Sequence, residues 1–190
     1  FNYEPRFAKP VFVYWLMSLS YHLFGVSEFA ARFPSAIFGV GLILLQYLFL
    51  TRCRGPVVGL FGAAMLLLNL EIIGLSRMAL TDSVLIFFTT LSLYGFWLGL
   101  YGEGRERHYL WFFYIGMALA TLTKGPIGFL IPMLAVGLHL WLTRSWGLFW
   151  RHGFPIPGLL LFLLLALPWY LIMLNIHGQR YTTSAQGDTI

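Results

Sequence analysis

Long apolar runs separated by short polar breaks dominate the chain from Phe33 onward. A helix needs about 20 mainly apolar residues to cross the hydrocarbon core of a bilayer, and most of the runs approach that length. We therefore predict six membrane-spanning helices, over Phe33–Leu50, Pro56–Leu75, Ser83–Tyr101, Tyr109–Thr123, Pro126–Leu142 and Pro155–Asn175. The fourth and fifth runs are the shortest, and only Lys124 and Gly125 separate them, which predicts a tight helical hairpin.

A shorter apolar segment, Pro10–Gly25, precedes the first run. Polar Ser20 and His22 interrupt it, and the aromatic side chains of Tyr14 and Trp15 suit the headgroup boundary of a membrane. We predict a helix that lies in the membrane interface rather than crossing the bilayer. The alternative, a core helix of a soluble domain, is disfavoured by the apolar sequence that surrounds it.

Composition supports a membrane protein. Of the 190 residues, 59% are hydrophobic and only 10% are charged, and the mean hydropathy is +0.78. A soluble domain carries roughly 25% charged residues, so a cytosolic enzyme, a nucleic-acid-binding module and a disordered chain are excluded. The predicted fold class is all-α, a polytopic transmembrane helical bundle with an interfacial helix. Charge in such a chain is rare and usually functional.

The positive charges form two sets, according to the side of the membrane on which the predicted helices place them. One set contains Arg52, Arg54, Arg105, Arg107, Arg144 and Arg151, and the other contains Arg6, Lys9, Arg32, Arg77, Lys124 and Arg180. Equal numbers mean that the excess of Lys and Arg in cytoplasmic loops does not by itself orient the chain. The first set is clustered in compact loops, whereas the second is spread singly among acidic residues, Pro and Gly. We expect the first face to be cytoplasmic and the second to lie outside.

Three short motifs on the expected outer face place ionisable groups beside Pro or a helix start; they contain Lys9, Arg77 with Asp82, and Lys124. Lys and Arg are the usual phosphate-binding side chains, so together these bases predict a site for a diphosphate or a lipid phosphate. Each residue also has a simpler interpretation. Asp82, after Thr81, suits a helix N-cap, and the bases suit anchors at the membrane boundary. Their occurrence on one face favours a shared anion site.

Two further features bear on the candidate chemistry. Glu71 lies about one turn inside the second predicted span, where it could pair with Arg77 or Lys124 or line a water-filled cavity. The single cysteine, Cys53, excludes an internal disulfide, and the histidines have no metal-ligand spacing. These residues predict no metal site.

The motifs also occur in the order of a known family. They are Lys9-Pro10 followed by Tyr14-Trp15, the segment Leu23–Ser35, Ser76-Arg77 with Leu80-Thr81-Asp82, Leu122–Pro126, and Leu167–Tyr170. Together they resemble membrane glycosyltransferases of the GT-C fold that use polyprenyl-phosphate sugars. The resemblance is greatest to bacterial aminoarabinose transferases of lipid A and to the related protein O-mannosyltransferases. It covers the chain from Lys9 to about Gly178.

The resemblance implies an inverting transfer of a sugar from a polyprenyl phosphate to lipid A, another glycan or a protein. The reaction would take place on the periplasmic or outer face of a bacterial inner membrane. Asp82 matches the family's second acidic residue, and Lys9 and Lys124 match lysines near the carrier-lipid phosphate. The family's first catalytic Asp corresponds to a position upstream of Phe1. The family's Glu before the first of these lysines has been associated with a metal, but Ala8 stands there, so no cofactor is assigned and a divalent metal stays an alternative.

We predict three regions, an outer-face loop with the interfacial helix at residues 1–32, a six-span domain at 33–175, and the start of an outer-face loop at 176–190. Because position 1 is Phe, we expect an internal piece of a longer protein. The partners expected are a lipid-linked donor and a membrane acceptor, without nucleic acid. The alternative function is a transporter or flippase of an anionic lipid. Transporters place polar groups near the midplane of repeated halves, whereas here charges gather at span ends, which favours an enzyme.

Overall fold

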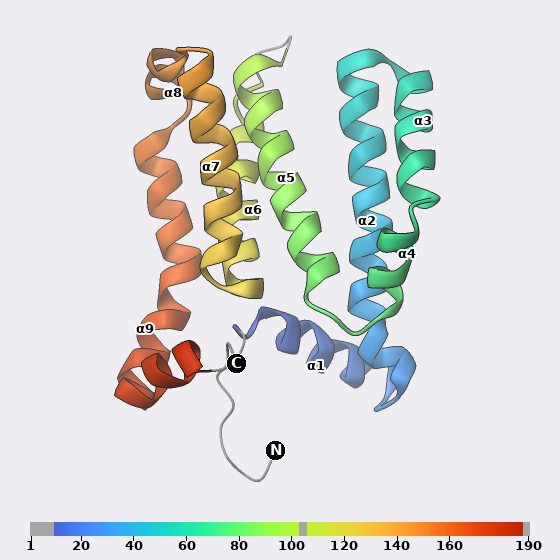
Figure 1. Ribbon diagram of the computed structural model, residues 1–190, viewed down its shortest axis with the longest axis vertical. Helices are drawn as coiled ribbons and strands as arrows, with labels where there is room; N and C mark the ends of the chain where they lie inside the picture. Colours follow the sequence, from blue (N-terminus) through green and yellow to red (C-terminus); the bar gives the residue numbers. More distant parts are fainter. Residues whose placement is uncertain (1–9, 103–105, 188–190) are drawn as a thin grey trace.

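The computed structural model describes residues 10–102 and 106–187, with side chains described as far as Ile176. All regular secondary structure in this part of the chain is helical, which confirms the predicted all-α class. The helices are α1 (Phe12–Phe24), α2 (Glu28–Arg54), α3 (Pro56–Leu67), α4 (Leu70–Arg77), α5 (Asp82–Tyr101), α6 (Tyr109–Lys124), α7 (Pro126–Leu142), α8 (Trp146–His152) and α9 (Pro155–Gly187). Figure 1 shows the long helices side by side, with α1 lying across one end of the bundle and α8 at the other. We call these the α1 end and the α8 end.

The helices differ in how well they match the thickness of a membrane. Three of those described, α2, α5 and α9, are long and apolar enough to cross a bilayer, and α3 with α4 forms a fourth if that bent pair counts as one span. Helices α6 and α7 have only 16 and 17 residues. At 1.5 Å per residue they reach about 25 Å, less than the ~30 Å hydrocarbon core. All six predicted runs are therefore helical, but only three form single helices of spanning length.

The second predicted span, Pro56–Leu75, is broken, so its prediction as one helix is wrong. Helix α3 ends at Leu67, and α4 begins at Leu70 with a bend of 62° between them. The break occurs because the Asn69 side chain accepts a hydrogen bond from the backbone N–H of Ile72 at 3.1 Å and so caps a new helix. Glu71 consequently lies in the first turn of α4 and is exposed. A negative charge is favourable at that end of a helix, which accounts for Glu71 without the predicted pairing.

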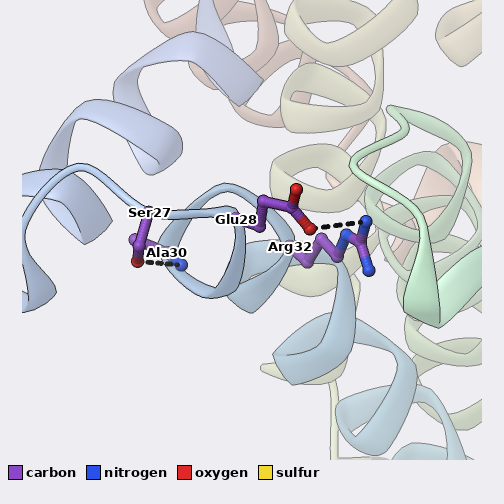
Figure 2. Close-up of polar contacts among 4 residues, drawn as sticks. All are labelled: Ser27, Glu28, Ala30 and Arg32. Atoms are coloured by element: carbon purple, nitrogen blue, oxygen red, sulfur yellow. Dashed lines mark hydrogen bonds and ion pairs between the residues drawn. The ribbon is translucent and has the colours of Figure 1, made fainter.

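Helix α2 begins at Glu28, so the predicted boundary between residues 32 and 33 falls inside a helix. The Ser27 hydroxyl accepts a hydrogen bond from the backbone N–H of Ala30 at 3.3 Å and caps the helix (Figure 2). One turn later Arg32 forms an ion pair with Glu28 at 3.2 Å. The two charges lie on one face of the first turns, and this local pairing allows the helix to include polar sequence before the apolar run.

Helix α9 extends beyond the last apolar run, which ends at Asn175. The structure gives α9 as helical through Gly187, so the predicted loop from residue 176 is wrong for residues 176–187. No proline occurs between Pro168 and Gly187 to stop the helix. The backbone therefore continues in helical form after the hydrophobic pattern has ended.

Where their side chains are described, the two predicted sets of basic residues lie at opposite ends of the helical bundle. In Figure 1, α4 ends, α5 begins and α6 turns into α7 at the α1 end, whereas the α2–α3 turn and the α7–α8 connection lie at the α8 end. The α1 end therefore carries Arg77 and Lys124, and the α8 end carries Arg52, Arg54 and Arg144. The two predicted sets of basic residues lie on opposite ends wherever they fall in the described side chains.

Helix α1 is fixed against the other helices by apolar and polar contacts. Its buried Val13 belongs to one core cluster with Val84 of α5 and Ala120 of α6. The Ser20 hydroxyl, also buried, donates a hydrogen bond to the carbonyl oxygen of Ala30 at 2.7 Å. These contacts hold α1 across the end of the bundle, as expected for the predicted interfacial helix.

Candidate functional site

Two of the predicted site residues, Asp82 and Lys124, meet at the α1 end. Asp82 is the first residue of α5 and Lys124 is the last residue of α6. The Lys124 Nζ atom lies 2.5 Å from Asp82 Oδ1, and the two side chains are 38% and 30% exposed. The residues are 42 positions apart in the chain, so the contact depends on the packing of α5 against α6. The pair is reached from the end of the bundle and forms the centre of the candidate site.

The turn after Lys124 explains why this side chain lies at the end of the bundle. Gly125 has a φ of +76°, a left-handed backbone conformation that glycine adopts without strain. Its N–H donates to the Thr121 carbonyl oxygen at 2.8 Å and so closes the last turn of α6. Pro126 then begins α7. The N–H that proline lacks would have no partner within the helix at this first position. A single residue thus reverses the chain, which confirms the predicted hairpin.

Asp82 does not act as the helix N-cap, so that simpler interpretation is wrong. Thr81 occupies the cap position, and Asp82 follows it as the first helical residue. The loop before Asp82 is held by Ser35 of α2, whose hydroxyl donates to the Leu80 carbonyl oxygen at 3.0 Å. This bond fixes the start of α5, and the Asp82 carboxylate pairs with Lys124.

The other two predicted bases are not brought into this contact. Arg77 is the last residue of α4, five positions before Asp82, and it is exposed. No ion pair of Arg77 occurs among the side chains described up to Ile176. Lys9 lies outside the described residues. Its neighbour Pro10 lies near the hairpin turn, since a Cβ placed on Gly125 would be 4.0 Å from Pro10 Cγ.

An aromatic pair on α9 completes this end of the bundle. The Tyr170 hydroxyl donates to the Thr121 carbonyl oxygen at 3.1 Å, and Trp169 packs edge-to-face on Trp15 of α1 at 6.1 Å between ring centroids. No individual role is predicted for Trp169 or Tyr170 from the sequence. Their signal was the Leu167–Tyr170 motif, in which two polar-tipped aromatic rings follow a long apolar run.

An apolar cavity lies against the hairpin that carries Lys124. It has a volume of about 260 Å³ and opens between the α6–α7 hairpin and α9. Its walls include Thr121 and Pro126, which lie on either side of Lys124 in sequence, and Phe129, Phe162 and Tyr170. The same hairpin therefore carries a charged side chain and one wall of an apolar cavity, a combination that suits a ligand with a charged head and an apolar chain.

The described residues do not supply a ligand set for a metal. Within residues 10–102 and 106–187, His, Cys, Asp and Glu form no group of three or more that could hold a metal ion. Ala8, at the position where the resembled family has a Glu, lies outside the described part. The metal alternative therefore stays a prediction that these residues do not test.

Comparison with known proteins identifies a family and several relatives. The family model described as dolichyl-phosphate-mannose-protein mannosyltransferase matches residues 1–180. An uncharacterized protein of Aquifex aeolicus (strain VF5) is 33% identical over 184 residues, which are 95% of this chain and 39% of that protein. The undecaprenyl phosphate-alpha-4-amino-4-deoxy-L-arabinose arabinosyl transferase 2 of Pseudomonas fluorescens (strain Pf0-1) is 30% identical over 179 residues, 92% of this chain and 31% of the relative. The chain thus spans well under half the length of these relatives.

Solved structures share the fold. The crystal structure of ArnT from Cupriavidus metallidurans in the apo state superposes with a TM-score of 0.90 over 98% of this chain and 35% of that one, at 24% identity. The structure of the same protein bound to undecaprenyl phosphate gives a TM-score of 0.86 at 27% identity, over 92% of this chain and 33% of that one. With a family match over nearly its whole length, this multi-pass membrane chain belongs to the dolichyl-phosphate-mannose-protein mannosyltransferase family.

Proposed function

We propose that the full-length protein is a glycosyltransferase that moves a sugar from a polyprenyl phosphate to an acceptor, which is lipid A, another glycan or a protein. The observation that carries this proposal is the Asp82–Lys124 pair, whose lysine lies on the hairpin that forms one wall of an apolar cavity. The donor class is supported by the undecaprenyl phosphate named for the ArnT structure and for the Pseudomonas relative.

Lys124 is suited to the phosphate of the donor. In the transfer, the bond between the anomeric carbon and a phosphate oxygen breaks, and the polyprenyl phosphate leaves with added negative charge. A lysine ammonium placed at that oxygen stabilises the growing charge. Arg77, exposed at the same end, and Lys9, beside Pro10, would add further positive charge to this cradle.

Asp82 is suited to the acceptor. Its carboxylate is partly exposed at the mouth of the site and can accept the proton of an attacking hydroxyl, or orient the group that does. Attack on the anomeric carbon from the face opposite the phosphate forms the new glycosidic bond with inversion.

The apolar cavity suits the isoprenoid chain of the donor. Its lining by Phe129, Phe162 and Leu167 presents an apolar wall next to the hairpin that carries Lys124. Burying isoprene units there would keep the phosphate at the Asp82–Lys124 pair while the rest of the chain stays in the membrane.

We place the α1 end outside a bacterial inner membrane. The arginines of the α8 end lie in or next to short connections: Arg52 and Arg54 end α2, Arg107 precedes α6, and Arg144 and Arg151 lie before and within α8. Such clusters favour the cytoplasmic side. The acceptor and the donor head would then meet at the periplasmic or outer face.

A transfer assay tests this proposal. The full-length protein in sealed vesicles receives a polyprenyl-phosphate sugar labelled in the sugar, together with lipid A. We expect the label to appear in the acceptor in an amount equal to the polyprenyl phosphate released. If the labelled lipid instead crosses the bilayer intact without any product, the protein is a transporter and the proposal is wrong. The transferases among the relatives give that alternative no support.

A further inference from the structure

Two neighbouring cavities lie at the α8 end, opposite the Asp82–Lys124 pair. The first has a volume of about 500 Å³, and its walls come from the ends of α2 and α5 and the start of α6. The second has a volume of about 300 Å³ and lies between α5 and α8. Both are lined by Tyr101 and Gly102. The end of α5 therefore separates two adjoining hollows that the proposed glycosyl transfer does not use.

The charged groups of these cavities are mainly positive. Arg52, Arg54 and Glu106 line the first, and Arg107 lines the second. Arg52 forms an ion pair with Glu106. Arg54 is exposed, and no ion pair to it occurs among the described residues. Among the described residues, three guanidinium groups and one carboxylate thus line these cavities, an excess that favours an anion.

His152 also lines the second cavity. Its Nδ1 atom is buried, without a hydrogen-bond partner among the described residues, so this atom does not face the space that a ligand would occupy. The arginines are therefore the groups of these cavities that suit an anion with several acceptor oxygens.

The position of the cavities indicates where the anion comes from. The first cavity is lined by the ends of the long helices α2 and α5, which lie at the α8 end (Figure 1). The ends of spanning helices are the level expected for the headgroups of one leaflet. Trp97, which is 43% exposed, and Tyr109 line the first cavity with Leu98. Aromatic rings of this kind favour the boundary between headgroups and acyl chains. The aromatic and aliphatic side chains that share the lining with the arginines suit a lipid better than a free phosphate.

We propose that these two cavities bind the phosphate headgroup of an anionic phospholipid in the leaflet at the α8 end. The guanidinium groups of Arg54 and Arg107 contact the phosphate oxygens, and Trp97 packs against the start of an acyl chain. Basic pockets between transmembrane helices are a recurrent form of lipid recognition. This site is separate from the glycosyl-transfer site and does not rest on the proposed function.

Lipid binding to the full-length protein in a neutral detergent tests the proposal. Native mass spectrometry with added phosphatidylglycerol or phosphatidylcholine gives the two affinities directly. We expect a clear preference for phosphatidylglycerol. Because each basic residue near a headgroup contributes about 1 kcal/mol, Arg54→Gln should weaken phosphatidylglycerol binding about fivefold, and Arg54→Gln with Arg107→Gln about thirtyfold. Phosphatidylcholine binding should change little.

Control variants separate this site from general surface charge. Arg144→Gln with Arg151→Gln removes the same charge at the same end but outside both cavities, and it should keep wild-type affinity. Arg54→Gln leaves the Arg52–Glu106 pair in place and so serves where the double variant is unstable. Equal weakening in the control, or no preference for phosphatidylglycerol in the wild type, would overturn the proposal. Displacement of the lipid by millimolar glycerol phosphate would assign the cavities to a soluble phosphate and would equally overturn it.

Discussion

Asp82→Asn in the full-length protein is expected to lower kcat for sugar transfer by about 10²- to 10⁴-fold, the usual contribution of a positioned general base. Asparagine keeps the size and shape of the side chain but cannot accept the proton of the acceptor. It also loses the charge that pairs with Lys124 at 2.5 Å. The KM for the lipid-linked donor should change much less than kcat, because the bases that meet the phosphate remain.

The matched control for Asp82→Asn is Glu28→Gln. It removes one carboxylate from an ion pair with Arg32, in which Glu28 is 88% exposed. We expect transfer close to the wild-type rate in this variant, since an exposed pair of this kind contributes little. Both variants are assayed with the labelled donor and lipid A, and their thermal unfolding is compared. Wild-type kcat in a folded Asp82→Asn protein would remove Asp82 from the catalytic machinery.

Gly128→Ala is expected to give the largest loss of stability. Gly128 is the third residue of α7. The backbone of α6 passes very close to it. A Cβ at this position would lie 2.2 Å from the Ala120 carbonyl carbon and 2.4 Å from the Thr121 nitrogen. Backbone atoms cannot rotate away as a flexible side chain can, so α6 and α7 must separate. Overpacking of this kind costs about 1–3 kcal/mol, and a clash with backbone belongs at or above the upper limit.

Thermal unfolding in detergent checks this expectation, with Gly137→Ala as the control. Gly137 is in the same helix, but a Cβ there meets nothing within 4 Å. That substitution should leave the melting temperature unchanged or raise it, since alanine is favoured over glycine in a helix by about 1 kcal/mol. Equal melting temperatures for the two variants would mean that α6 and α7 are not packed as described. Because the hairpin carries Lys124, Gly128→Ala should also weaken donor binding.

Much of the fold follows from local pattern. Apolar runs bounded by Gly, Pro and Arg predicted the helices, and Gly125-Pro126 predicted the hairpin because glycine tolerates a left-handed turn and proline suits the first turn of a helix. The sides of the basic residues followed from the alternation of the runs. These features depend on neighbours in sequence, and the structure confirms them.

The structure differs from the prediction where a single side chain starts a helix or where residues far apart in the chain come into contact. Asn69 caps α4 within an apolar run that the hydropathy pattern predicts to be one helix. Ser27 caps α2 several residues before the apolar run of that helix begins. The Asp82–Lys124 contact joins residues 42 positions apart, and the bond from Tyr170 to Thr121 spans 49 positions. The periodicity of apolar residues carries no information on contacts between residues so far apart in the chain. The resemblance to the family predicted Asp82 and Lys124 as site residues, but their contact is seen only in the packing of α5 on α6.

The proposed function requires that the α1 end bind the phosphate of a polyprenyl carrier through Lys124. The most direct test is the Kd of undecaprenyl phosphate for the full-length wild type, Lys124→Gln and, as a control from the α8 end, Arg144→Gln. Loss of a charge-assisted hydrogen bond should weaken binding about 10- to 100-fold in Lys124→Gln, whereas Arg144→Gln should bind as the wild type does. An unchanged Kd in a folded Lys124→Gln protein would mean that Lys124 does not bind the carrier phosphate.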